Sequence, residues 1–234
     1  MHILALIPAR GGSKNPPHKN ILPFKGKPLV VHSIEHALQA QSVTRAIVST
    51  DSETIAEISR RAGAEIPFMR PVEYAGDLST DLDVFRHALN WLDEHEGYRP
   101  EIIVHLRPTS PLRPPGLIDM GVKRFLSHPE ADSLRTVVPA PHTPYKMWRL
   151  NGDYLEPLLT HPEFREPYNM PRQLLPPVHW QNAYLDVIRW TTVMEKNSMT
   201  GDRILALPMS PDDDVDIDSQ RDLTRAELKV SGGQ

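Results

Sequence analysis

The chain has 234 residues, of which 39% are hydrophobic, so it is long enough for one large α/β domain with a buried core. Its formal net charge of −4 excludes general attraction to nucleic acid, and any basic site must therefore be local. Cysteine is absent, which excludes disulfides, thiolate metal sites and cysteine nucleophiles. The first residues enter an apolar run without a basic leader, so we expect a cytoplasmic protein with no membrane partner.

That first apolar run, residues 3–7, is short enough for a buried strand and too short for a membrane span. The loop that follows Pro8 combines glycines with fixed cations: Arg10, Gly11, Gly12, Lys14 and Lys19. Glycines let the backbone approach a ligand closely, and consecutive N–H groups can form an anion nest. The spacing is neither that of a P-loop nor Gly-x-Gly-x-x-Gly. Because open α/β sheets bind ligands where buried strands end, we interpret the loop as a polyphosphate site rather than a solvated basic loop.

The next elements alternate between helix and strand. After a turn at residues 25–28, apolar residues at helical spacing predict a helix, and residues 46–50 predict a second strand. A second helix follows and ends near Gly63, and residues 65–69 predict a short third strand. This order predicts an α/β fold, with a Rossmann-like, mostly parallel sheet and helices on both faces.

Arg70 follows the third predicted strand, which places it on the same rim of the sheet as the first loop. The alternative interpretation is a surface arginine paired with Glu73 or Asp77. A helix is predicted to begin near Thr80, where Asp83 completes a capping box.

A proline-rich loop follows the next strand, which is predicted at residues 101–106. The loop reads Arg107-Pro-Thr-Ser-Pro-Leu-Arg113, and its prolines limit the entropy lost when it grips a ligand. A helix at residues 117–126 and a strand at residues 133–138 continue the alternation.

The pattern breaks at residues 139–181, where prolines and aromatic residues follow no clear period. A stretch of this length without structure is uncommon inside a compact domain. We interpret it as an arm inserted into a single domain spanning residues 1–234, and we place it at a dimer interface because aromatic residues suit a buried interface. A flexible lid is the alternative.

Strands are predicted again at residues 182–188 and 204–208, and an acidic segment containing Asp216-Ile-Asp218 follows. The intervening apolar residue places both carboxylates on one side of an extended segment. Because Mg²⁺ prefers hard oxygen ligands beside a polyphosphate, we expect a magnesium site at Asp216 and Asp218. The alternative is a solvated acidic run in which Asp218 or Ser219 only caps the last helix.

Four of these segments resemble, in the same order, the motifs of the acylneuraminate cytidylyltransferases, the enzymes that make CMP-sialic acid and its relatives. The segments are Ile7-Pro-Ala-Arg-Gly-Gly-Ser-Lys14 with Lys19-Asn20, Arg70-Pro71 with Ala75-Gly-Asp77, Pro108-Thr-Ser-Pro-Leu-Arg113, and Asp216-Ile-Asp218. The resemblance covers nearly the whole chain. It implies a CTP-dependent nucleotidyltransferase that transfers CMP to an acidic sugar, a nonulosonate or octulosonate, and releases pyrophosphate. It also implies a homodimer in which the arm completes the neighbour's site.

The resemblance further implies residue roles. The expected nucleotide-binding residues are Ala9, Arg10, Gly11, Gly12, Ser13, Lys14, Lys19, Asn20 and Arg70. We expect Arg10, Lys19 and Asp218 to act in catalysis, because nucleotidyl transfer depends on positioning and charge neutralisation. Asp216 and Asp218 would hold Mg²⁺, and no general base stands out.

Departures from the family pattern concern the acceptor. Arg107 stands where the sialic acid enzymes usually have Gln, Trp180 replaces an arginine, and Asp186 replaces a tyrosine. The expected acceptor-binding residues are Arg107, Lys146, Arg172, Gln173, Trp180 and Asn182, with the Arg172–Gln173 pair reaching the partner's site. Arg107 offers a bidentate fork for an acid group, so we expect the acceptor to be an acid. Because this set of cations differs from the family's and Trp180 would shrink or flatten the pocket, we expect an acceptor other than N-acetylneuraminate.

Three alternatives remain open from the sequence. The acceptor could be a smaller acid such as a phosphonate, or the chain could be a nucleotide-binding relative without transfer activity. A sugar-1-phosphate nucleotidyltransferase that uses another base is the third. The pair Asp216 and Asp218 argues against an inactive relative, because binding alone needs no catalytic metal.

Overall fold

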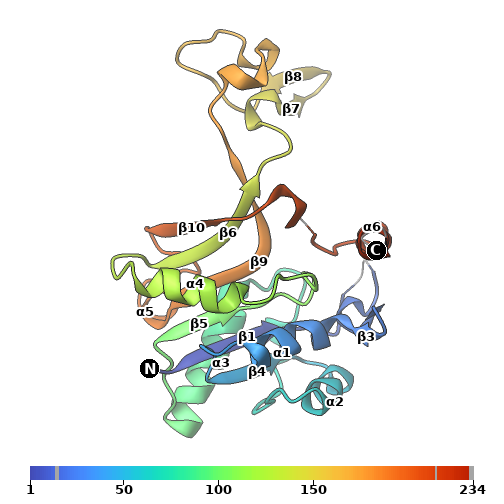
Figure 1. Cartoon of the computed structure of the whole chain (residues 1–234), viewed down its shortest axis with the longest axis vertical. Coiled ribbons are helices and arrows are strands. Elements are labelled where there is room, and N and C mark those ends of the chain that lie inside the picture. The colour runs from blue at the N-terminus through green and yellow to red at the C-terminus, as the bar shows by residue number, and fades with distance from the viewer. Residues whose placement is uncertain (14–15, 214, 232–234) are drawn as a thin grey trace.

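The computed structural model describes residues 1–13, 16–213 and 215–231, and a six-stranded sheet forms its centre (Figure 1). The strands lie in the order β10-β6-β9-β5-β1-β4. Their bounds are Ile3–Pro8 (β1), Arg45–Ser49 (β4), Ile102–His105 (β5), Ser133–Pro139 (β6), His179–Arg189 (β9) and Ile204–Pro208 (β10). The pairings β1–β4, β1–β5 and β10–β6 are parallel, whereas β9 is antiparallel to both β5 and β6. The predicted Rossmann-like, mostly parallel sheet is therefore confirmed.

Helices cover both faces of the sheet, because the strand side chains alternate between two apolar clusters. In β1, Ile3, Ala5 and Ile7 belong to one cluster, while Leu4 and Leu6 belong to the other. The first cluster includes residues of α1 (Leu29–Gln39), α2 (Glu53–Arg61), α4 (Leu117–Leu126) and α6 (Gln220–Ser231). The second includes residues of α3 (Asp81–Glu96) and α5 (Trp190–Met194). None of the helices within the described ranges is both long and apolar enough to cross a membrane.

Local sequence signals place the helix ends correctly. The Thr80 side chain accepts a hydrogen bond from the Asp83 N–H, and the Asp83 carboxylate accepts one from the Thr80 N–H, which is the predicted capping box at the start of α3. The predicted strand at residues 65–69 is wrong: Glu65 alone makes an isolated bridge, to Ile47. Pro67 has no N–H to donate to a strand ladder, which explains why pairing stops there.

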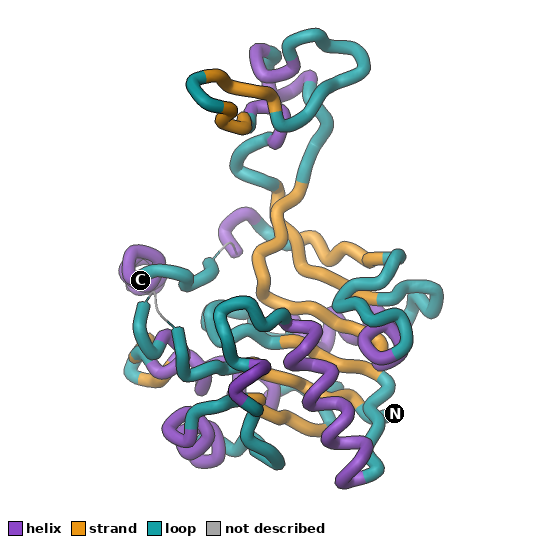
Figure 2. Tube along the Cα trace, turned by 180° about the vertical axis from the view of Figure 1, so that it is seen from behind, coloured by secondary structure: helices purple, strands orange, loops and turns teal. Residues whose placement is uncertain are grey.

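The segment between β6 and β9 projects away from the sheet, as both views show (Figures 1 and 2). It contains a hairpin of β7 (Trp148–Asn151) and β8 (Tyr154–Pro157), in which every residue is exposed. Short 3₁₀ turns complete it at Pro144–Lys146, Pro167–Asn169 and Arg172–Leu174. The inserted arm therefore has local structure of its own, and its place at a dimer interface stays a prediction.

Smaller elements shape the first loop and the last segment. They are β2 (Pro23–Phe24), β3 (Lys27–Pro28) and 3₁₀ turns at Lys19–Ile21, Val72–Tyr74 and Pro211–Asp213. The turn between β2 and β3 uses Lys25 and Gly26, both at positive φ, and leads directly into α1 as the sequence predicts.

Candidate functional site

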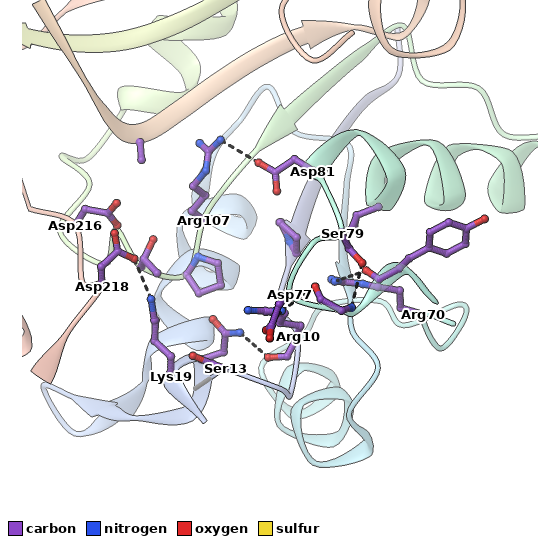
Figure 3. A pocket seen from close by; sticks show the side chains of 18 residues that line it. Arg10, Ser13, Lys19, Arg70, Asp77, Ser79, Asp81, Arg107, Asp216 and Asp218 are labelled. Carbon is purple, nitrogen blue, oxygen red and sulfur yellow. Dashed lines mark hydrogen bonds and ion pairs between the residues drawn. The ribbon is translucent and has the colours of Figure 1, made fainter. Parts of the chain in front are cut away.

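A cleft of about 460 Å³ opens at the carboxyl ends of β1 and β5, beside the start of α3 (Figure 3). Its lining comes from the loops after β1 and β5, the segment from Arg70 to α3, and the acidic segment before α6. It brings together the predicted site residues Arg10, Ser13, Lys19, Asn20, Arg70, Arg107, Asp216 and Asp218. The glycine-rich loop and the distant acidic pair therefore share one cleft, as their proposed joint role requires.

The glycine-rich loop is held in shape by hydrogen bonds between its backbone and neighbouring residues. The Ala9 N–H donates to the Ser49 carbonyl at 2.9 Å, and the Asn20 side-chain amide donates to the Arg10 carbonyl at 2.9 Å. The Gly11 N–H donates to Asp51 Oδ1 at 2.8 Å. A Cβ atom at Gly11 would lie 2.9 Å from the Ser52 Cβ, which is too close, so this position requires glycine.

Several of the predicted nucleotide-binding residues of this loop do not line the cleft. Ala9 and Gly11 shape the loop and do not line the cleft, and the N–H groups of both already have protein acceptors. Gly12 is exposed and also lies outside the lining. Lys14 lies outside the described residues. The cleft is lined instead by side chains of the loop, those of Arg10 and Ser13 among them.

Three cations that line the cleft are each paired with a carboxylate that also lines it (Figure 3). The pairs are Lys19 Nζ with Asp218 Oδ1 at 2.9 Å, Arg10 Nη1 with Asp77 Oδ1 at 3.1 Å, and Arg107 Nη2 with Asp81 Oδ2 at 3.3 Å. Each carboxylate is about half exposed or more, so these ion pairs are open to solvent, and another anion can replace the carboxylate in each pair.

Arg70 is buried, which excludes the alternative of a surface arginine paired with Glu73 or Asp77. Its residual exposure is 5%. Arg70 Nε donates to Ser49 Oγ at 3.0 Å, and Nη2 donates to the Ser49 carbonyl. Burial lowers the Arg70 pKa to about 10, partly offset by Asp51, so the guanidinium remains charged at neutral pH. It contributes a fixed positive charge to the wall of the cleft.

The acidic segment alternates as predicted. Val215 and Ile217 are buried, while Asp216 is half-buried and Asp218 exposed, so both carboxylates face the cleft (Figure 3). The Ile217 N–H donates to the Thr109 carbonyl at 2.8 Å and ties the segment to the loop after β5.

The carboxylate of Asp216 has unused ligand capacity. Its Oδ1 is buried without a hydrogen-bond partner among the described residues, and burial, with the nearby Asp218, raises its pKa. The cap of α6 is made by Ser219 and Asp222, whose side chains accept from each other's N–H groups, so capping does not occupy Asp218. Two neighbouring carboxylates, of which Asp216 keeps a buried oxygen without a hydrogen-bond partner among the described residues, fit a hard divalent cation.

The predicted acceptor residues divide into two groups. Arg107 lines the cleft, whereas Lys146, Arg172 and Gln173 lie on the projecting arm and do not line the cleft of their own chain. Arg172 instead donates to the Ala140 carbonyl at 2.7 Å, at the base of the arm.

Strand β9 places the remaining two residues outside the cleft. Trp180 is 58% exposed and pairs with Val138 in β6. Asn182 is buried and donates to the Asp213 carbonyl at 3.2 Å. The β6–β9 register shifts at this point, and Ala183 takes a positive φ of 60°, so Ala183 rather than Asn182 faces the cleft.

Three carboxylates of this site, Asp77, Asp81 and Asp186, were not among the predicted site residues, and Asp77 is the partner of Arg10 described above. Asp81 lines the cleft at the start of α3. Asp186 is 1% exposed and lies between Arg107 and Arg135, whose nitrogens donate to it at 2.9 and 3.0 Å. An aspartate in the middle of an apolar strand is itself a signal, because a buried carboxylate needs a cationic partner.

Comparison with known proteins agrees with this arrangement. The family model described as Cytidylyltransferase matches residues 4–150. The CMP-N,N'-diacetyllegionaminic acid synthase of Legionella pneumophila is 38% identical over 123 residues, which are 53% of this chain and 53% of that protein. The pseudaminic acid cytidylyltransferase of Campylobacter jejuni is 34% identical over 128 residues, 55% of each chain. The aligned part of this chain thus spans about half the length of these relatives.

Two further similarities extend over the whole chain. The post-translational flagellin modification protein B of Campylobacter coli is 28% identical over 228 residues, covering 97% of this chain and 94% of that protein. A structure of CMP:2-keto-3-deoxy-manno-octonic acid synthetase complexed with CTP matches with a TM-score of 0.72 at 16% identity, covering 100% of both chains. At that identity the structural match supports the fold alone. The family match, together with the motifs that meet in one cleft, shows that the chain belongs to the cytidylyltransferase family, as its resemblance to the acylneuraminate enzymes predicted.

Proposed function

We propose that the chain transfers CMP from CTP to a hydroxyl group of an acidic sugar, a nonulosonate or octulosonate, and releases pyrophosphate. The observation that carries the proposal is the 2.9 Å contact between Lys19 of the glycine-rich loop and Asp218 of the acidic segment, which lie 199 residues apart in sequence. The names of the relatives, a CMP-legionaminic acid synthase and a pseudaminic acid cytidylyltransferase, support this acceptor class.

The nucleotide would occupy the half of the cleft lined by the first loop and Arg70. Arg10 and Lys19 are held by Asp77 and Asp218 in the free chain, and each would exchange that carboxylate for a phosphate oxygen. Arg70, whose guanidinium is fixed by Ser49, would provide a charge that needs no rearrangement. Such preorganised charges stabilise the negative charge that builds up on the phosphate oxygens during transfer.

We also propose that Asp216 and Asp218 hold Mg²⁺. The support is chemical: both carboxylates line the cleft, and Asp216 Oδ1 has no other partner among the described residues. A bound magnesium ion would neutralise charge on the phosphate oxygens. Lys19 would then leave Asp218 and bind the triphosphate.

In the transfer itself, the sugar hydroxyl attacks the α-phosphorus in line, and the bond from that phosphorus to the oxygen bridging to the β-phosphate breaks. The sugar oxygen becomes bonded to the α-phosphorus of the CMP group, the hydroxyl proton passes to solvent, and pyrophosphate leaves. The chain's contribution is to position both substrates and balance charge. The acceptor would lie toward Arg107, the lining cation that belongs to neither the first loop nor the Arg70 segment.

The arm supports a homodimer within this proposal. Leu150, Tyr154 and Leu155 are 76%, 80% and 59% exposed, so the hairpin presents apolar side chains to solvent. Lys146 and Arg172 of the arm do not line the cleft of their own chain, and in a dimer they would complete the partner's cleft. We place this activity in the cytoplasm, where CTP is available. Light scattering should give twice the chain mass of 26.5 kDa; a monomer at assay concentrations would contradict the dimer.

The activity is tested by measuring pyrophosphate release with each of the four nucleoside triphosphates and a panel of acids. The panel contains N,N'-diacetyllegionaminic, pseudaminic, N-acetylneuraminic and 3-deoxy-manno-octulosonic acids, with phosphonoacetate for the smaller-acid alternative. We expect release that requires both CTP and a sugar acid, with N-acetylneuraminate not the best acceptor. CTP binding without pyrophosphate release in the presence of any acid would favour a nucleotide-binding relative without transfer activity. Preference for another triphosphate would favour a sugar-1-phosphate nucleotidyltransferase that uses another base.

A further inference from the structure

Asp186 holds one edge of the Arg107 guanidinium from inside the sheet. Asp186 lies on β9 directly opposite His105 of β5 and Arg135 of β6. Its Oδ2 accepts from Arg107 Nη1 at 2.9 Å, and its Oδ1 accepts from Arg135 Nε at 3.0 Å. The Asp186 side chain is only 2% exposed, so this contact is shielded from solvent and from competing ions.

The other edge of the same guanidinium has a weaker partner. Arg107 Nη2 lies 3.3 Å from Asp81 Oδ2, and the Asp81 side chain is 46% exposed at the rim of the cleft (Figure 3). A long, solvent-accessible ion pair contributes little to stability and is easily replaced. Arg107 therefore has one permanent carboxylate and one that another anion can displace.

The charges around Asp186 keep Arg107 attractive to an anion. Asp186 faces two guanidinium groups, so these three side chains together have a net positive charge, and from the cleft side Asp81 makes the direct ion pair with Arg107 while Asp216 acts on it from further away. His105 adds no charge, because its complete burial, followed by the effect of Arg107, holds its pKa well below the usual value. Burial works against ionisation of Asp186, but the charges of Arg107 and Arg135 outweigh it and lower the Asp186 pKa.

We propose that the acid group of the acceptor binds Arg107 Nη2 by displacing Asp81, while Asp186 holds Nη1 and keeps the guanidinium in position. This inference rests on the proposed function and names how that site selects an acid. Acceptors without a negative charge cannot replace the carboxylate that Arg107 already has. Asp81 thus acts as an internal competitor that raises selectivity for acids, and Asp186 is a positioning residue.

The test compares two variants with the wild type, using the best acid of the panel and its 1-carboxamide, which keeps the sugar but removes the charge. Asp81→Asn removes the competing carboxylate, so we expect the KM for the acid to fall roughly two- to five-fold, which matches the free-energy contribution of an exposed ion pair. The KM value for the carboxamide should not change. Asp186→Asn should raise the KM for the acid roughly ten- to hundred-fold, the worth of a charge-assisted hydrogen bond, and reduce the preference for acid over carboxamide.

The matched control is Glu73→Gln, which removes an exposed carboxylate just before α3 that does not line the cleft. If Asp81→Asn and Glu73→Gln give the same acid KM, the displacement of Asp81 is refuted. If Asp186→Asn does not fold, Asp81→Asn with the acid and carboxamide pair still decides the question. A wild-type protein that is inactive with every acid refutes the proposed function itself. An active protein whose KM for the acid is unchanged by Asp81→Asn refutes only the displacement of Asp81.

Discussion

Replacing Arg10 by alanine should weaken CTP binding far more than it weakens the fold. Arg10 Nη1 donates to the Gly76 carbonyl at 2.8 Å and to Asp77 Oδ1 at 3.1 Å, and its side chain is 33% exposed. Losing an exposed pair of this kind costs the folded state roughly 0.2–1 kcal/mol. Losing a charged hydrogen bond to a phosphate costs roughly 1.5–3 kcal/mol of binding free energy, which corresponds to about 10- to 150-fold in Kd.

Calorimetric titration of CTP in the presence of magnesium, at one fixed salt concentration, measures this difference directly. Arg60→Ala is the matched control, because Arg60 is an exposed arginine of α2 that pairs with Glu53 at 2.7 Å and does not line the cleft. We expect the control to keep the wild-type Kd. If Arg10→Ala binds CTP within two-fold of the wild type, the triphosphate does not bind at this loop.

The remaining predictions concern Asp218, ionic strength and His36. Asp218→Asn should lower turnover at least about 100-fold, with no change in melting temperature because its side chain is 72% exposed; a fully active variant would remove the metal assignment. The association rate of CTP, measured by stopped flow in magnesium buffer, should depend only weakly on salt; a steep fall would contradict a charge-balanced cleft. Burial, and then Arg113, lowers the His36 pKa to about 4. Between pH 6.5 and about 4 the unfolded chain therefore binds a proton at His36 that the folded chain does not. The free energy of unfolding decreases as the pH is lowered through this range. His36→Gln should lose less stability over that range in urea unfolding, and an equal loss would contradict the assignment.

The parts of the fold that local rules control could be predicted. The run Ile3–Ile7 became the buried strand β1, and Thr80 with Asp83 made the predicted capping box. The meeting of Lys19 with Asp218 was also predicted, but only because the motif order resembles a family. Hydrophobic periodicity alone gives no reason for residues 199 positions apart to touch, since that contact depends on how the last segment returns to the loop after β5, where the Ile217 N–H donates to the Thr109 carbonyl.

The parts that could not be predicted depend on backbone irregularities and on distant partners. The shift in the β6–β9 register and the positive φ of Ala183 turn Asn182 into the interior and leave Trp180 in solvent. Neither effect has a signal in the sequence around residue 183. Arg70 is buried because Ser49, 21 residues earlier, provides two acceptors for its guanidinium.

The charge count of the cleft supports the proposal that a cation accompanies the nucleotide. The described lining contains four cations, Arg10, Lys19, Arg70 and Arg107, and four carboxylates, Asp77, Asp81, Asp216 and Asp218, so its formal charge is 4 − 4 = 0. A bare triphosphate therefore finds no net attraction there, although the site is rich in arginine and lysine. In the proposed reaction, affinity comes from exchange: Asp77, Asp81 and Asp218 give up their cations to the substrates, and each freed carboxylate needs a new positive partner or water. At Asp216 and Asp218 a divalent cation would meet that need, which couples nucleotide binding to metal binding.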